Sequence, residues 1–169
     1  MKKLIGLYIE DEPKNITMLQ AWFELYSKKE IELVGVDVFP QQLNEFYDIV
    51  IDKNIDFLIV DHELDKVPVS YKGIDVLKEI RKNDRNIYAI LLTNFSLDNY
   101  REELGEYDFQ LEKRELQDPE KVKELVVKIK RACDLRSDND ILAGMVEVQK
   151  EEDALLQLLE QVKDRIDKD

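Results

Sequence analysis

The stretch LYIEDEP, residues 7–13, joins a buried strand to a cluster of acids. Three apolar residues that suit a strand end are followed at once by Glu10, Asp11 and Glu12. Like charges packed at the tip of a strand repel one another unless something neutralises them. Pro13 then suits the first turn of a helix, where its missing N–H is not needed. The stretch predicts a strand, an acidic site and a helix, with Glu12 as a first-turn helix acid.

Apolar runs of strand length alternate with amphipathic segments of helix length along the rest of the chain. The predicted strands are residues 3–9, 31–39, 55–60, 87–92 and 107–111. The predicted helices lie in residues 13–26, 41–54, 74–82, 96–107 and 118–135, with Ser96 as an N-cap candidate. Five strand–helix repeats predict an α/β fold with a doubly wound parallel sheet.

The charge balance excludes two classes of partner. The 169 residues include 38 acidic and 25 basic side chains, which gives a formal net charge of −13. Binding to nucleic acid or to an anionic membrane needs an excess of Lys and Arg, so we expect neither. The chain has one cysteine, Cys133, and its N-terminus lacks the apolar run of a signal peptide. We therefore expect a soluble, cytoplasmic protein.

A second unit follows the five repeats. The polar run RSDND, residues 136–140, interrupts the last helical pattern, so we expect a domain at 1–136 and an amphipathic helix at 137–169. Residues in the second segment recur at alternating spacings of four and three, as in a coiled coil: Ile141, Met145, Val148, Glu152, Leu155, Leu159, Val162 and Ile166. The helix either forms a dimeric coiled coil, docks on a partner, folds back on its own domain or frays.

Polar residues stand at the ends of four of the predicted strands. Glu10 and Asp11 follow the first strand, Asp61 the third, Thr93 the fourth and Lys113 the fifth. In an open parallel sheet, ligands gather beyond the carboxyl ends of the strands. The order of the strands along the chain therefore predicts that these five side chains meet at one edge.

This combination of groups suits phosphoryl chemistry around a divalent cation. Closely spaced carboxylates favour Mg²⁺, which takes oxygen ligands and often phosphate oxygens as well. Asp61 is placed to act as an acyl-phosphate nucleophile. Thr93 can donate a hydrogen bond to a phosphoryl oxygen, and Lys113 can supply a positive charge. Taken singly, each residue also has a plainer explanation, as a helix cap or a solvated side chain.

Five motifs resemble the receiver domain of two-component response regulators (CheY-like) over residues 1–135. They are LYIEDEP (7–13), FLIVDHEL (57–64), GIDVLKEIR (73–81), AILLTN (89–94) and FQLEK (109–113). The resemblance implies a flavodoxin-like (βα)₅ fold with strand order 2-1-3-4-5, here followed by the long C-terminal helix. It also implies a phosphoprotein that acts in a phosphorelay.

The same resemblance implies a role for each site residue. Glu10 and Asp11 match the acidic pair that holds Mg²⁺, and Asp61 matches the phosphoacceptor, which is also a metal ligand. The backbone carbonyl of Glu63 would complete the metal shell. Thr93 and Lys113 match the switch hydroxyl and the phosphate-binding lysine. The implied partners are a sensor histidine kinase or phosphotransfer protein and a downstream protein.

The chain departs from the family pattern at several positions. Glu10 stands where Asp is commoner. Arg114 follows the lysine where the family usually has proline, and Gln110 lies where the switch aromatic is usual. Asn94 follows Thr93 where a small residue is common. These differences put the usual coupling between threonine and aromatic residue in question.

Three functions are consistent with these residues. The first is a receiver that is phosphorylated on Asp61 and signals through protein contacts, with no enzymatic activity beyond its own Mg²⁺-dependent phosphorylation and dephosphorylation. The second is a receiver-like scaffold that no longer switches and that dimerises through residues 141–166. The third is a phosphatase, in which DHE (residues 61–63) would stand for a D-x-D motif; such enzymes usually carry it after the first strand.

Overall fold

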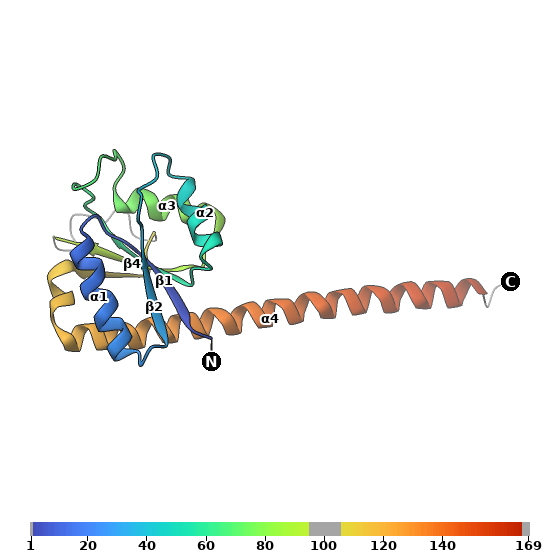
Figure 1. Cartoon of the computed structure of the whole chain (residues 1–169). Helices are drawn as coiled ribbons and strands as arrows, with labels where there is room; N and C mark the ends of the chain where they lie inside the picture. The colour runs from blue at the N-terminus through green and yellow to red at the C-terminus, as the bar shows by residue number, and fades with distance from the viewer. Residues whose placement is uncertain (1, 95–105, 167–169) are drawn as a thin grey trace. The chain divides into compact units, whose positions relative to one another are not determined.

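The computed structural model describes residues 2–94 and 106–166, in which five parallel strands form one sheet (Figure 1). The strand order is β2-β1-β3-β4-β5, which confirms the predicted order. The strands are β1 (Leu4–Ile9), β2 (Ile31–Gly35), β3 (Phe57–Asp61), β4 (Tyr88–Thr93) and β5 (Phe109–Glu112). The doubly wound α/β class is confirmed with it.

Helices connect these strands or follow the last one. They are α1 (Pro13–Tyr26), α2 (Glu45–Asp52), α3 (Gly73–Asn83), the 3₁₀ turn η2 (Lys113–Gln117) and α4 (Pro119–Ile166). Pro13 is the first residue of α1, as predicted. The helix predicted within residues 96–107, with its cap at Ser96, falls almost entirely on residues 95–105, which lie outside the described part of the chain.

The second strand is shorter than predicted. It ends at Gly35, whereas the apolar pattern continues to Phe39. β2 is an edge strand that pairs only with β1, and the last pair of that ladder is Tyr8 with Gly35. Because β1 itself ends at Ile9, the chain beyond Gly35 has almost no partner strand left.

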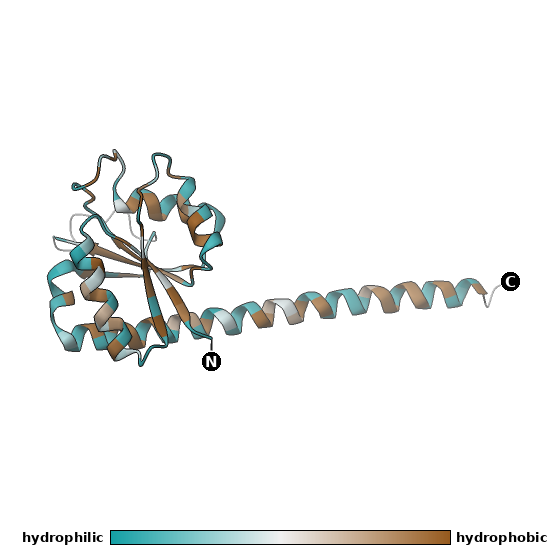
Figure 2. Ribbon diagram, viewed as in Figure 1, coloured by the Kyte–Doolittle hydropathy of each residue, from teal (hydrophilic) through white to brown (hydrophobic). Residues whose placement is uncertain are grey.

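The sheet is buried on both faces by two separate apolar clusters. Side chains alternate between faces along a strand, so Leu58 and Val60 lie in one cluster while Phe57 and Ile59 lie in the other. The first cluster contains residues of α2 and α3, and the second contains residues of α1 and of the first turns of α4. The central strands appear brown along their length in Figure 2. A sheet that is covered in this way leaves its polar groups at the strand ends.

The interruption predicted at residues 136–140 is wrong, because α4 is continuous from Pro119 to Ile166. None of these five residues is Pro or Gly, and Ser, Asp and Asn each cost only some tenths of a kcal/mol in a helix relative to Ala. Contacts within the chain divide it into two compact units, Met1–Cys133 and Asp134–Asp169. The helix contributes residues to both. Among the described residues, no helix is both long and apolar enough to span a bilayer.

Gly73 lets the start of α3 lie directly on the end of β3. Its N–H donates to the carbonyl of His62 over 3.0 Å. A Cβ at this position would lie 2.1 Å from the carbonyl oxygen of Asp61, well inside the distance at which atoms clash. Since the clash is with backbone, the neighbour cannot rotate away. Gly73 therefore holds the helix and the Asp61 segment in close register.

We predict that Gly73→Ala lowers the free energy of unfolding by about 1–3 kcal/mol, the usual cost of overpacking. Gly144→Ala is the matched control, because a Cβ there meets nothing within 4 Å. In a helix interior that change favours the helix by up to about 1 kcal/mol. Urea unfolding followed by circular dichroism compares the two variants with the parent chain. Equal stability of Gly73→Ala and the parent would show that Gly73 lies farther from the Asp61 backbone than described.

Candidate functional site

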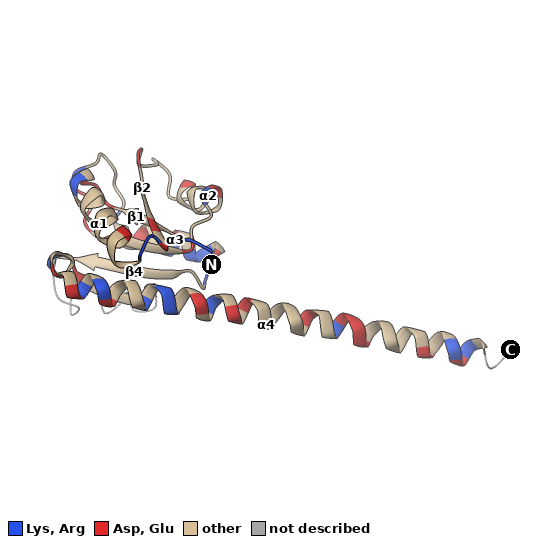
Figure 3. Cartoon of the chain, turned by 60° about the horizontal axis from the view of Figure 1, so that its bottom comes forward, with Lys and Arg blue, Asp and Glu red and all other residues tan. Residues whose placement is uncertain are grey.

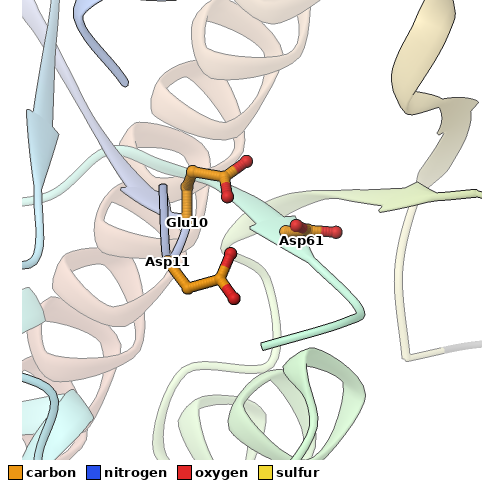
Figure 4. A group of neighbouring side chains, drawn as sticks. All are labelled: Glu10, Asp11 and Asp61. Carbon is orange, nitrogen blue, oxygen red and sulfur yellow. The ribbon is translucent and has the colours of Figure 1, made fainter. Parts of the chain in front are cut away.

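Three carboxylates meet where β1 and β3 end. Glu10 and Asp11 directly follow the last residue of β1, and Asp61 is the last residue of β3. One carboxylate oxygen from each lies within 4.8 Å of the others. Figure 4 shows the three side chains grouped at this edge. The structure thus brings together the acids that the strand order places at one edge.

Two of these acids are buried, which makes their charges costly. Glu10 and Asp61 are each 1% exposed. A buried carboxylate needs an opposite charge or hydrogen-bond donors. Asp61 has only part of this, because no group in the described part of the chain donates a hydrogen bond to its Oδ1. One oxygen of the predicted phosphoacceptor is therefore left for a ligand.

Lys113 brings one positive charge to this group of acids. It follows β5 directly, and its Nζ lies 2.6 Å from Oδ2 of Asp61 and 2.8 Å from Oε2 of Glu10. Its side chain is partly exposed. A single ammonium thus bridges two strand ends. It leaves the cluster net negative, as a site for a divalent cation should be.

Neighbouring donors hold the two acids after β1 in place. The hydroxyl of Tyr8 donates to Oε2 of Glu10 over 3.0 Å, and the backbone N–H of Glu12 donates to Oε1 over 3.0 Å. The N–H of Lys66 donates to Oδ2 of Asp11 over 2.6 Å. These contacts fix the direction of each carboxylate before any ligand binds. Such pre-positioned oxygens are what a metal site needs.

The ionisation of the cluster follows from burial and from Lys113. Burial raises the pKa of Asp61 to about 6, with Glu10 and Asp11 adding to the shift and Lys113 opposing it. Burial and the nearby Glu10 also raise the pKa of Asp11. Burial acts on Glu10 in the same sense, but hydrogen bonds from Asp11, Lys113 and the Glu12 N–H outweigh it and lower the pKa of Glu10. The pKa of Lys113 is raised, because its bonds to the two acids outweigh its burial.

Thr93 lies at the same edge and is fully buried. It is the last residue of β4, one position beyond the residue that pairs with Asp61 in the sheet. Its Oγ1 accepts a hydrogen bond from Nε2 of Gln110 over 3.0 Å, and Oε1 of Gln110 accepts one from the hydroxyl of Tyr107 over 3.0 Å. The sequence resemblance puts Gln110 at the position of the switch aromatic residue, but it does not predict that Gln110 bonds to Thr93. The signal lies in the β4–β5 register, which makes it a diagonal neighbour of Thr93.

The remaining sequence candidates lie around the rim. The side chain of Glu63 pairs with Lys72 over 3.2 Å. The metal-binding role of the Glu63 backbone carbonyl stays a prediction. Arg114 is mostly exposed and pairs with Glu112. A cleft of about 370 Å³ opens beside Lys113 and is lined in part by Lys14 and Asn94. The cleft therefore reaches the residues that directly follow β4 and β5.

No protein-family model matches the chain, and no curated protein matches it. Several solved structures match the chain. The response regulator TrrA from Thermotoga maritima, in complex with Mg²⁺ and BeF, matches with a TM-score of 0.54 and 25% identity, over 78% of this chain and 99% of that one. A complex of the histidine kinase ThkA with TrrA matches with a TM-score of 0.56 and 26% identity, over 76% and 98%.

A response regulator receiver domain protein from Clostridium thermocellum matches with a TM-score of 0.59 and 22% identity, over 79% of this chain and 97% of that one. In each case nearly the whole of the solved chain is covered. The similarity is to a complete domain, and it is consistent with the strand order and with the first compact unit. The first compact unit therefore has the fold of the CheY-like receiver domains of two-component response regulators, and a long C-terminal helix follows the last strand.

Proposed function

We propose that Asp61 accepts a phosphoryl group with the help of Mg²⁺. The metal would be held by Glu10, Asp11, Asp61 and the backbone carbonyl of Glu63, and when bound it would neutralise the acids and polarise a phosphoryl oxygen. The observation that carries this proposal is the state of Asp61. One of its oxygens is held by Lys113, and the other is buried without a hydrogen-bond donor among the described residues.

The proposed step is a displacement at phosphorus. A carboxylate oxygen of Asp61 forms a new O–P bond while the P–N bond to a phosphohistidine imidazole breaks, and the released imidazole takes its proton from solvent. Lys113 faces the transferred oxygens with its positive charge, and the Thr93 hydroxyl donates to one of them. These are the positioning and charge roles on which phosphoryl transfer depends.

The proposed donor is a sensor histidine kinase or a phosphotransfer protein in the cytoplasm. The ThkA–TrrA complex supports this choice, because that response regulator is seen bound to a histidine kinase. The proposed output is a protein–protein contact with a downstream partner. We propose no turnover of other substrates, since the groups at this edge suit the protein's own phosphorylation and dephosphorylation.

We also propose that residues 141–166 pair with a second copy of the chain as a coiled coil. The seven apolar seam residues of this segment are all between 52% and 69% exposed: Ile141, Met145, Val148, Leu155, Leu159, Val162 and Ile166. An exposed seam that recurs every three and four residues suits the packing of another helix. If this pairing does not depend on phosphorylation, it supports the non-switching scaffold alternative.

Charge favours an antiparallel arrangement of the two helices. Residues 138–153 carry six acids and one base, whereas residues 154–166 carry two of each (Figure 3). Parallel pairing would set the acidic halves side by side and place Glu152 opposite its own copy in the seam. Antiparallel pairing sets each acidic half against a neutral one. Like charges directly opposed in a seam select against a pairing.

The first prediction from the proposed function concerns covalent labelling of Asp61. Incubation with phosphoramidate or acetyl phosphate and Mg²⁺ should add the mass of one phosphoryl group, and peptide mapping should place it on Asp61. Asp61→Asn should stay unlabelled, because an amide is a poor nucleophile. Omission of Mg²⁺ should suppress labelling of the parent chain. An unlabelled parent, under conditions that label a known receiver, would contradict the proposal.

The second prediction concerns stability and pH. The pKa of Asp61 is about 6 in the folded chain, above its ordinary value of 3.8, so the folded state binds the proton more tightly. Ionisation of Asp61 therefore subtracts stability as the pH rises from 4 to 7. Without Mg²⁺ at pH 7.5, the free energy of unfolding of Asp61→Asn should exceed that of the parent by about 1–3 kcal/mol. The difference between the two chains should disappear near pH 4.

Mg²⁺ provides the matching control for that measurement. A ligand that binds only the folded state stabilises it, so Mg²⁺ should raise the melting temperature of the parent much more than that of Asp61→Asn. If Asp61→Asn is instead the less stable chain at pH 7.5, the ionised carboxylate is not a burden on the fold.

The third prediction concerns the coiled coil. The parent should sediment as a dimer. Leu159→Glu should be a monomer, because it buries a charge in the seam, and Gln157→Glu should remain a dimer, because it adds the same charge away from the seam. Spin labels on Asp140→Cys, in a Cys133→Ser background, should lie about 40 Å apart in an antiparallel dimer, from a rise of 1.5 Å per residue. A separation of roughly half that value would indicate a parallel pair.

A further inference from the structure

We infer that Gln110 is a positioning residue for Thr93: its amide sets the direction of the Thr93 hydroxyl proton and links Thr93 to Tyr107. This inference rests on the proposed phosphorylation of Asp61. It adds the residue that orients the Thr93 hydroxyl toward the phosphoryl group. Gln110 occupies the place where the receiver pattern usually has an aromatic residue. An aromatic side chain has no amide N–H to give, so this chain couples Thr93 through a different contact.

The direction of the hydrogen bonds decides where the Thr93 hydroxyl proton points. A threonine hydroxyl has one proton to donate and two lone pairs that can accept. Gln110 donates from Nε2 to Oγ1 of Thr93 over 3.0 Å, which uses a lone pair and not the proton. The proton is then directed to another acceptor. When Asp61 carries a phosphoryl group, its oxygens are that acceptor.

Tyr107 fixes which end of the amide faces Thr93. Its hydroxyl donates to Oε1 of Gln110 over 3.0 Å, so the oxygen of the amide is held toward Tyr107 and the nitrogen toward Thr93. Tyr107 is partly buried and packs against the apolar cluster that contains α2 and α3. A movement of Thr93 toward a phosphoryl group would therefore pull on Gln110 and, through it, on Tyr107.

Burial makes this contact strong enough to matter. Thr93 is fully buried and Gln110 is partly buried, so water competes weakly for the bond. The β4–β5 register holds the two residues as diagonal neighbours on one face of the sheet, with Lys113 just beyond the end of the same strand as Gln110. Gln110, which would orient Thr93, and Lys113 therefore come from the same strand end. Thr93 and Lys113 would both contact the phosphoryl group on Asp61.

The test compares Gln110→Glu with Gln110→Leu in beryllofluoride binding with Mg²⁺, followed by ¹⁹F NMR. Glutamate has the shape of glutamine but only accepts hydrogen bonds at neutral pH, so it should draw the Thr93 proton away from the ligand. A hydrogen bond to a charged group is worth a factor of about ten or more in affinity. We expect Gln110→Glu to weaken binding by at least that factor and Gln110→Leu to weaken it less.

The same changes in a Thr93→Val background separate positioning from general charge or packing effects. With no hydroxyl to orient, the loss caused by Gln110→Glu should shrink to the small effect of the added charge, which is the coupling that a double-mutant cycle measures. Additive losses, or parent-like affinity in both Gln110 variants, would overturn the inference. The melting temperature of each variant without ligand shows whether it is folded.

If the parent binds no beryllofluoride, that result counts against the proposed function and not against the link between Gln110 and Thr93. A measurement without ligand tests the link in that case. Tyr107→Phe removes one oxygen, and it leaves Thr93 and Gln110 unchanged. Through the amide it should shift the γ2-methyl resonance of Thr93, and Gln110→Glu should shift it further. A Thr93 methyl signal that is indifferent to Tyr107→Phe would contradict the link between the two residues.

Discussion

The pairing of one ammonium with a group of close carboxylates is the interaction on which the site depends. Lys113 contacts both Asp61 and Glu10, and Asp11 completes the group within a few ångströms. The charges do not balance, because three acids face one base. Burial makes this imbalance expensive, and the raised pKa of Asp61 expresses that cost. A buried excess of negative charge is relieved either by protonation of a carboxylate or by a bound cation, and the proposed Mg²⁺ would supply the second.

The rest of the first unit serves to hold these groups at one edge. Two apolar clusters cover the faces of the sheet, so the strands are rigid and their ends keep their positions. Gly73 allows α3 to rest on the backbone next to Asp61, and the N–H of Lys66 orients Asp11. Asp61, the proposed phosphoacceptor, is thus placed by packing, and the charges around it set its ionisation. Hydrogen bonds link Thr93 to Gln110 and Gln110 to Tyr107, and we propose that a change at Asp61 reaches Tyr107 through them.

Much of this architecture is predictable because it depends on local patterns. Apolar runs that end in Asp, Glu or Thr identify both the strands and the residues at their carboxyl ends, and the strand order then brings Glu10 and Asp61 together. The resemblance places Gln110 where the switch aromatic residue is usual, but its hydrogen bond to Thr93 depends on the register of β4 and β5, which no local sequence pattern encodes. The predicted break at residues 136–140 does not occur, because Ser, Asp and Asn are weak helix formers that only lower helix stability slightly.

A crystal structure of the full chain grown with Mg²⁺ and beryllofluoride would show whether the three carboxylates hold a metal ion beside a modified Asp61. We expect a metal ion bound to oxygens from Glu10, Asp11 and Asp61, directly or through a water molecule. We also expect a beryllofluoride group on Asp61 within hydrogen-bond reach of Lys113 and Thr93. Density for the metal on the acidic residues of 138–153 in α4 instead, with the three carboxylates and Lys113 unchanged, would contradict the proposed site.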